Sequence, residues 1–121
     1  MARILVIDDD EQTRDVLKQM LEVEGFDVLE AGDGEEGAKV YTEKRPDLVI
    51  TDIIMPKKGG LETIIKLKQE YPDIKIFAIS GGGRVIKADF LTIAESIGAL
   101  KAFEKPFNRA ELIKAVKEAL A

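Results

Sequence analysis

Consecutive carboxylates follow an apolar run near the start of the chain, in the stretch LVIDDDEQ. Two like charges about 4 Å apart cost roughly 4 kcal/mol at an effective dielectric constant near 20, so Asp8, Asp9 and Asp10 predict a positive partner. We interpret Asp10 as a residue of the following helix start. A further acid, Asp52, follows the apolar run in VITDIIMP. Oxygen ligands without nitrogen or sulfur favour a hard cation, and a few carboxylates completed by water suit Mg²⁺ better than Ca²⁺.

Two other residues at the ends of apolar runs add phosphate-binding chemistry. Ser80 supplies a hydroxyl and Lys105 an ammonium group. Phosphoryl transfer depends mainly on positioning and on neutralising charge at the phosphoryl oxygens, and a carboxylate can act as the nucleophile. If these groups meet, the metal, Ser80 and Lys105 could each hold one phosphoryl oxygen while Asp52 attacks.

The composition limits the classes of function. The 121 residues suffice for one domain, and the absence of Cys and His removes disulfides, thiolate chemistry and the usual general base and transition-metal ligand. The net charge of −5 comes from 23 acids and 18 bases that are mixed along the chain, so we expect no direct nucleic-acid binding. The first apolar run is too short for a signal peptide and no run could span a bilayer. We expect a soluble, cytoplasmic domain without membrane contact.

Short apolar runs alternate with longer amphipathic ones, a pattern typical of βαβ units and a parallel sheet. Gly25 can end the first helix in a left-handed conformation, and Asn108 with Glu111 predicts the start of the last helix. The expected strands are residues 3–7, 27–31, 47–51, 74–79 and 100–103, and the expected helices are 12–24, 34–44, 61–71, 85–97 and 109–120.

The spacing of apolar residues also predicts which helix faces are buried. In the first helix Val16, Leu17, Met20 and Leu21 recur at helical spacing and predict one buried face. We therefore expect this helix to lie against the sheet.

The strand order follows from how apolar each strand is. Glu30 and Lys101 interrupt the second and fifth strands, which indicates edge positions, whereas the other three are continuous as interior strands are. Right-handed crossovers then give a doubly wound five-stranded parallel α/β sheet of order 2-1-3-4-5 with helices on both faces, the flavodoxin-like arrangement. Ligands in such sheets bind beyond the carboxyl ends of the strands where the order reverses, so Asp8, Asp9 and Asp52 should share one crevice.

The chain resembles the receiver domains of two-component response regulators over nearly its whole length. The resemblance lies in VIDDD, in VITDIIMP with Gly60 four residues past Pro56, in the pair Ser80–Gly81, and in EKPF. It implies one receiver domain over residues 1–121, similar to the chemotaxis regulators. Two hypotheses for its output stay open: a receiver that acts alone by docking, or a piece of a longer regulator.

The resemblance implies a phosphorylation switch that catalyses only its own phosphorylation and dephosphorylation. Asp52 would receive the phosphoryl group from a phosphohistidine on a sensor histidine kinase or phosphotransfer protein. Asp9, Asp52 and the backbone carbonyl of Ile54 would contact Mg²⁺, with Asp8 helping, usually through water. Phosphorylation would then change binding to a downstream protein target that the sequence does not identify.

The remaining family motifs carry further implications. Ser80 and Lys105 would bind the phosphoryl group, and the Lys105–Pro106 peptide bond is expected to be cis. Because the chain has no His, it cannot donate a phosphoryl group to itself. The side chain of Ile54 cannot orient an attacking water, which predicts slow self-dephosphorylation.

One position departs from the family pattern. Receivers commonly carry Tyr or Phe three residues before the lysine, where this chain has Ala102, and strand alternation points the neighbouring Phe103 to the opposite face. We therefore expect switching to depend more on the stretch SGGGR, residues 80–84, whose glycines have wide backbone freedom.

Two alternatives from other classes stay open. A Mg²⁺-dependent phosphatase with an aspartyl nucleophile commonly places a second acid two residues after that nucleophile, where this chain has Ile54. A flavin-binding electron carrier would share the strand order, but its phosphate site would face three carboxylates. Both alternatives fit the residues less well than the receiver hypothesis.

Overall fold

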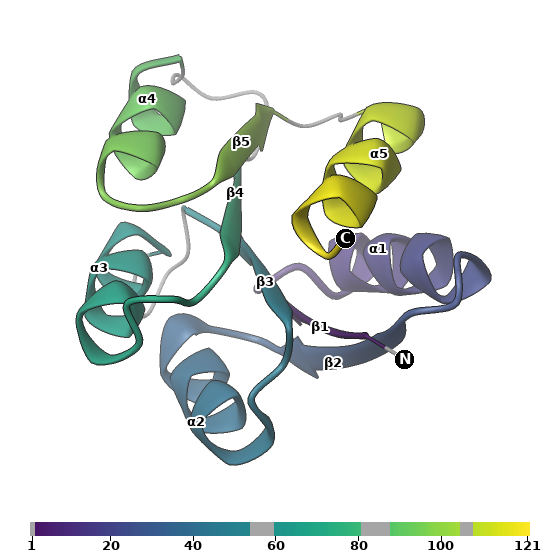
Figure 1. The fold of residues 1–121 in the computed structure, drawn as a ribbon, viewed down its shortest axis with the longest axis horizontal. Helices are drawn as coiled ribbons and strands as arrows, with labels where there is room; N and C mark the ends of the chain where they lie inside the picture. Colours follow the sequence, from purple (N-terminus) through teal and green to yellow (C-terminus); the bar gives the residue numbers. More distant parts are fainter. Residues whose placement is uncertain (1, 54–59, 81–87, 105–107) are drawn as a thin grey trace.

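A computed structural model describes residues 2–53, 60–80, 88–104 and 108–121. Strands and helices alternate along the chain (Figure 1). The strands are β1 (Arg3–Ile7), β2 (Asp27–Ala31), β3 (Leu48–Asp52), β4 (Ile76–Ser80) and β5 (Lys101–Glu104). The helices are α1 (Glu11–Val23), α2 (Gly34–Lys44), α3 (Gly60–Glu70), α4 (Ala88–Ser96) and α5 (Arg109–Ala119).

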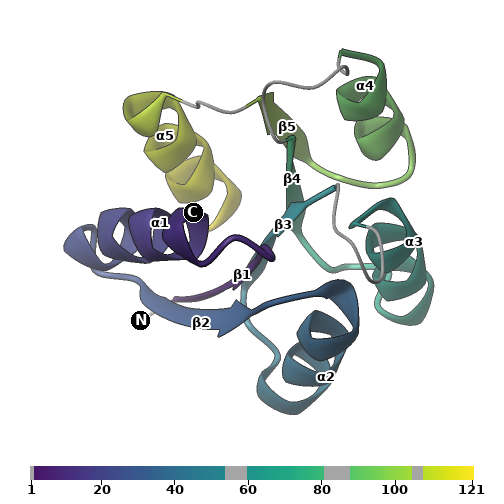
Figure 2. The same ribbon diagram turned by 180° about the vertical axis from the view of Figure 1, so that it is seen from behind.

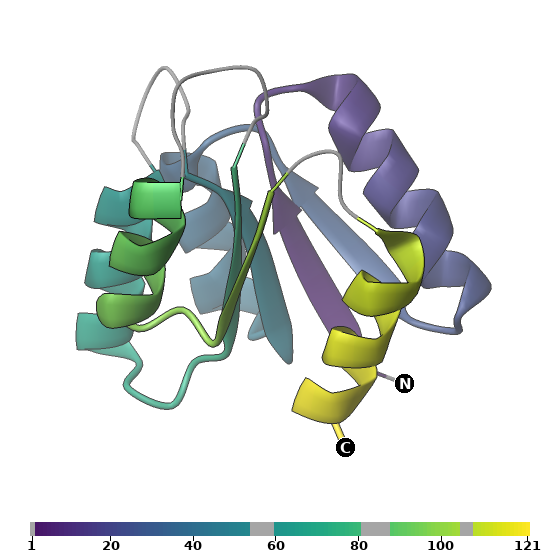
Figure 3. The same cartoon turned by 90° about the horizontal axis from the view of Figure 1, so that it is seen from above.

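The five strands form one sheet of order β2-β1-β3-β4-β5, and every neighbouring pair is parallel. Helices α1 and α5 cover one face, and α2, α3 and α4 cover the other (Figures 1 and 2). The view along the sheet shows the two helical layers on either side of the strands (Figure 3). The predicted fold class and strand order are confirmed.

Each face of the sheet has its own hydrophobic core. Strand β1 is buried from its second residue onward, β3 is buried throughout, and β2 and β5 are partly exposed, as expected for edge strands. The core beneath α1 and α5 includes Leu17, Leu21, Phe77, Leu112 and Val116. The core beneath α2, α3 and α4 includes Tyr41, Ile64, Leu67, Ile76 and Ala94.

Helix ends follow the residue types at their boundaries. The side chain of Asn108 accepts a hydrogen bond from the Glu111 N–H at 3.0 Å, as predicted, and Gly25 has φ of +95° just after α1. The predicted buried face of α1 is right for Leu17 but wrong for Val16, which is 54% exposed. Leu17, Met20 and Leu21 form the buried face, and Val16 lies at its margin.

Several predicted boundaries differ by one or two residues. The third strand runs one residue further than predicted and includes Asp52, because the ladder with β4 continues to that residue. The fourth strand begins at Ile76 rather than at 74, because the Ile74 N–H bonds to the Tyr71 carbonyl in the turn after α3. The fifth strand begins and ends one residue late, and α4 ends at Ser96, one residue before the prediction; residues 85–87 lie outside the described part.

Candidate metal and phosphoacceptor site

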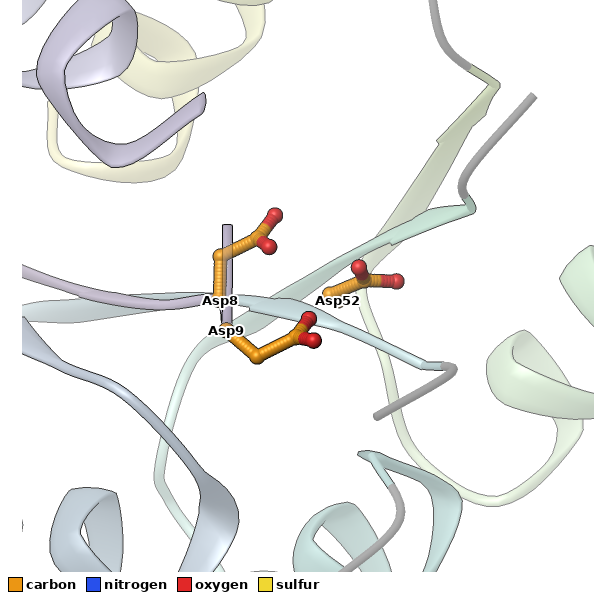
Figure 4. Close-up of side chains that lie close together, drawn as sticks. All are labelled: Asp8, Asp9 and Asp52. Carbon is orange, nitrogen blue, oxygen red and sulfur yellow. The ribbon is translucent and has the colours of Figure 1, made fainter. Parts of the chain in front are cut away.

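The carboxyl ends of the two central strands bring three acids together. Asp8 and Asp9 directly follow β1, and Asp52 is the last residue of the neighbouring strand β3. One carboxylate oxygen from each acid lies within 4.8 Å of the other two. Figure 4 shows the three side chains beside one another at this edge. The strand order therefore produces the convergence that the sequence predicts.

Backbone contacts fix Asp8 within the cluster. Its side chain is fully buried, and its Oδ1 accepts a hydrogen bond from the Asp10 N–H at 2.9 Å. Its own N–H donates to the Ala31 carbonyl of β2 at 3.1 Å. A buried carboxylate needs hydrogen-bond partners, because burying it without them costs free energy. The orientation of Asp8 is thus set by the fold.

The strand ladder fixes Asp52. Its Cα is in register with Ile79 of β4, and the Ile53 N–H donates to the Ile79 carbonyl at 2.9 Å. The hydroxyl of Thr51 donates to the Asp52 carbonyl at 3.0 Å. Asp52 is only 4% exposed, whereas Asp9 is exposed, so the cluster has two buried acids and one that faces solvent.

Asp10 has a different role from the three clustered acids. Its carboxylate accepts hydrogen bonds from the Gln12 N–H at 3.1 Å and from the Thr13 hydroxyl at 2.8 Å. It therefore caps α1, where a negative side chain also interacts favourably with the helix dipole. This geometry supports its interpretation as a helix-start residue.

The other predicted site residues are only partly described. Ser80 ends β4 in register with Glu104, which ends β5, so the backbone of Ser80 lies at the same edge as the acids. The side chain of Ser80, together with Ile54, Lys105, the peptide bond after Lys105 and residues 81–84, lies outside the described part. Their proposed roles stay predictions.

The predicted alternation in β5 is confirmed. Phe103 packs with the core beneath α1 and α5, and its ring centroid lies 5.6 Å from that of Phe77. Ala102 packs with the core on the other face, beneath α2, α3 and α4. The aromatic side chain next to Ala102 is therefore held on the face away from the position that the family pattern uses.

Sequence reasoning missed Arg14 of α1. Its Nη1 donates to the Asp8 carbonyl at 2.6 Å and its Nε donates to the Glu30 carboxylate at 3.2 Å. The sequence held a signal for this contact, because Glu30 is an acid inside an otherwise apolar strand. Taken by itself, that acid indicates only an edge strand.

The donor set fits a hard divalent cation. All three side chains offer oxygen, and the 4.8 Å within which their oxygens lie is comparable to the roughly 4 Å between opposite ligands around Mg²⁺. The exposed position of Asp9 leaves room for water ligands, which Mg²⁺ usually keeps. Asp8, Asp9 and Asp52 are thus the residues that would hold the ion.

The fold and the acids together define a class of protein: a doubly wound α/β domain with a cluster of acids where its strand order reverses. Residues 4–117 match the family model described as the response regulator receiver domain. The chain belongs to this family, whose members act as switches in two-component signalling.

Individual relatives agree with the family match. The transcriptional regulatory protein CpxR of Klebsiella pneumoniae is 34% identical over 120 residues, which cover 99% of this chain and 50% of that protein. The sporulation initiation phosphotransferase F of Bacillus subtilis is 30% identical over 118 residues, covering 98% of this chain and 93% of that protein. The chain thus spans about half the length of CpxR but nearly all of the phosphotransferase.

Solved structures show the same architecture. A response regulator receiver domain protein from Clostridium thermocellum superposes with a TM-score of 0.89 at 33% identity, covering 98% of this chain and 94% of that one. The chemotaxis protein CheY4 of Vibrio cholerae gives a TM-score of 0.87 at 26% identity and covers 98% of both chains. These matches give no support to the phosphatase alternative.

Among the described residues, no helix is both long and apolar enough to cross a membrane.

Proposed function

We propose that this receiver accepts one phosphoryl group on Asp52 in a Mg²⁺-dependent reaction and thereby changes its binding to a downstream protein. The donor would be a phosphohistidine on a sensor histidine kinase or phosphotransfer protein, because this chain contains no His of its own. The observation that supports the proposal best is the convergence of Asp8, Asp9 and Asp52 within 4.8 Å at the carboxyl edge of the sheet.

The proposed reaction is a substitution at phosphorus. A carboxylate oxygen of Asp52 attacks, an oxygen–phosphorus bond forms, and the bond from phosphorus to the donor nitrogen breaks while the nitrogen keeps the electron pair. Asp9, Asp52 and the backbone carbonyl of Ile54 would contact the ion, and Asp8 would help, usually through water. When bound, Mg²⁺ neutralises charge on the phosphoryl oxygens.

Two further residues complete the proposed site. The hydroxyl of Ser80 and the ammonium group of Lys105 would bind the phosphoryl oxygens that the metal leaves. Support for their position comes from the backbone: β4 ends at Ser80 and β5 ends at Glu104, directly before Lys105. The receiver catalyses only its own phosphorylation and dephosphorylation in this proposal, and the apolar side chain of Ile54 makes the second step slow.

The partners of the receiver follow from its role as a switch. We expect contact with one phosphodonor protein and one downstream protein, and no direct nucleic-acid binding by these 121 residues, whose acids outnumber their bases. CpxR is named as a transcriptional regulatory protein, but the match covers only 50% of it. The expectation about nucleic acid therefore concerns only the residues of this chain and not the rest of CpxR. A cytoplasmic location is part of the proposal, and a chain without cysteine is compatible with a reducing compartment.

Labelling with a small phosphodonor tests the nucleophile. Wild-type protein incubated with phosphoramidate and Mg²⁺ should gain the mass of one phosphoryl group, and Asp52→Asn should gain none because an amide is a poor nucleophile. Asp10→Asn is the matched control: Asn is an equally good helix cap, so labelling should persist. Removal of Mg²⁺ with a chelator should stop labelling of the wild type. Labelling that persists in Asp52→Asn would falsify the assignment.

A further inference from the structure

A single guanidinium group joins the acidic cluster to the edge of the sheet. Arg14 lies in the first turns of α1, and only 19% of its side chain is exposed. Its Nη1 donates to the Asp8 carbonyl at 2.6 Å, while its Nε pairs with the Glu30 carboxylate of β2 at 3.2 Å. The short first contact is charge-assisted and therefore among the stronger hydrogen bonds of a protein.

This contact completes the fixation of Asp8. The Asp8 N–H donates to Ala31, its carboxylate accepts from the Asp10 N–H, and its carbonyl accepts from Arg14. The Asp8 carbonyl belongs to the same planar peptide as the Asp9 N–H, so a bond to one end sets the orientation of the other. Arg14 therefore determines the plane from which the exposed Asp9 extends toward Asp52.

We propose that Arg14 is a positioning residue for the cation site, and that Glu30 orients Arg14. The role rests on the proposed function, since positioning matters only if Asp8, Asp9 and Asp52 bind the ion. Groups that hydrogen-bond to metal ligands and so fix their orientation commonly matter for metal binding. Their removal lowers metal affinity or activity by about 10- to 100-fold. Arg14 acts here through the backbone of a ligand residue, not through contact with the ion.

The charge of Arg14 makes the proposal sharply testable. A cation beside the cluster repels Mg²⁺, so the field of Arg14 alone would weaken metal binding, and its removal would strengthen binding. Positioning has the opposite sign. Lysine keeps the charge but not the planar fork that spans the Asp8 carbonyl and Glu30 at once. Arg14→Gln and Arg14→Lys therefore separate the two effects.

Magnesium titration of the metal-free protein tests the role without any phosphorylation. Affinity is measured calorimetrically, and amide chemical shifts of Asp9 and Asp52 report that the ion binds at this site. Arg14→Gln and Arg14→Lys should both bind Mg²⁺ roughly 10-fold more weakly than the wild type. Glu30→Gln should weaken binding less, and adding it to Arg14→Gln should have no further effect, because the two residues act through one contact.

Lys18 provides the matched control. It lies one turn further along α1 and reaches the same Glu30 carboxylate at 3.9 Å. Lys18→Gln removes a charge from this neighbourhood but leaves the bond to Asp8, so its Mg²⁺ affinity should not fall. Thermal unfolding of each variant separates the metal site from stability: a merely structural arginine would lower the melting temperature and leave the affinity unchanged.

The outcomes distinguish the inference from the function on which it rests. If the wild type binds Mg²⁺ but Arg14→Gln binds it equally or more tightly, the positioning role is wrong and the proposed function stands. If Arg14→Gln does not fold, Arg14→Lys and Glu30→Gln give the same test, and wild-type affinity in both overturns the role. If the wild type itself shows no Mg²⁺ binding, the proposed function fails first.

Discussion

Charged side chains are arranged differently at the two ends of the parallel sheet. At the carboxyl edge, three acids gather within 4.8 Å. At the amino edge, cations have partners: the Arg45 guanidinium lies 4.4 Å from the centroid of the Tyr71 ring, and Lys75 Nζ donates to the Ala119 carbonyl at 2.6 Å. The contacts of the cations at the amino edge therefore stabilise the fold. The carboxyl edge gathers three acids, whose mutual repulsion a bound cation would reduce.

The charged groups of the amino edge follow ordinary rules of pairing, whereas the acids of the carboxyl edge cluster. Tyr41 and Tyr71 pack at a centroid distance of 4.9 Å below Arg45, and the Asp47 carboxylate accepts from the Arg3 N–H at 2.8 Å. These contacts obey the usual preferences for pairing and stacking. Three acids gathered at the carboxyl edge depart from the usual spacing of like charges, and a departure of this kind commonly marks a functional site.

The largest expected difference between the ends is their response to Mg²⁺. A ligand that binds only the folded state at 100 times its Kd stabilises it by about 2.7 kcal/mol, so urea unfolding with Mg²⁺ should show an increase of this size. Arg45→Ala should keep the full increase, and Asp9→Asn should lose most of it. An equal increase in Asp9→Asn and in the wild type would show that the ion acts elsewhere.

Without metal, neutralising one acid at each end should have opposite effects. Asp9→Asn relieves repulsion and should raise the free energy of unfolding by about 1 kcal/mol, the energy of a charge pair near 4 Å in water. Asp47→Asn weakens a charge-assisted bond to the Arg3 N–H and should lower it. Urea unfolding in chelator measures both variants. A loss of stability in Asp9→Asn would contradict the repulsion argument.

Arg45 gives a smaller and purely structural test of the amino edge. This residue ends α2 with φ of +47°, a left-handed conformation that strains any residue with a Cβ. Arg45→Ala keeps that strain and loses the contact with Tyr71, so it should be less stable by about 0.5 to 1 kcal/mol. Arg45→Gly loses the same contact but relieves the strain, and its stability in urea should lie above that of Arg45→Ala. The reverse order would mean that the left-handed backbone at this position does not strain a residue with a Cβ.

Much of the fold was predictable because its signals are local. Continuous apolar strands, the interruptions at Glu30 and Lys101, and Asn108 before the last helix each determine structure through near neighbours. The strand order then brings Asp8 and Asp52 together, although 44 positions separate them in the sequence. The convergence of these acids could be predicted from the sequence because the order of the strands alone places them at the same edge of the sheet.

The errors arose where packing between distant elements decides the outcome. Nothing in the sequence around Val16 indicates that it lies at the exposed margin of the buried face of α1. The bond from Arg14 to the Glu30 carboxylate depends on the distance between α1 and β2, which no spacing rule gives. The late start of β4 has a local cause instead, because the turn after α3 satisfies the Ile74 N–H through the Tyr71 carbonyl.

The smallest expected effect is at alkaline pH and concerns Tyr41. Burial raises the pKa of Tyr41 above its ordinary value of 10.0, and the nearby Arg45 partly opposes this shift. Because the folded protein holds the proton more tightly than the unfolded chain, the stability that this contributes is fully present below pH 10 and is lost as pH rises through the folded pKa.

Tyr71→Phe leaves Tyr41 as the sole tyrosine, so ultraviolet absorbance of tyrosinate should report a pKa above 10.0 in the native state. Arg45→Ala in that background should raise the pKa further, because it removes the charge that favours the ionised form. A fall in the pKa of Tyr41 would mean that Arg45 acts mainly by shielding the Tyr41 ring from water. The packing of Tyr41 against Tyr71, and not the charge of Arg45, would then be the main stabilising contact at the amino edge.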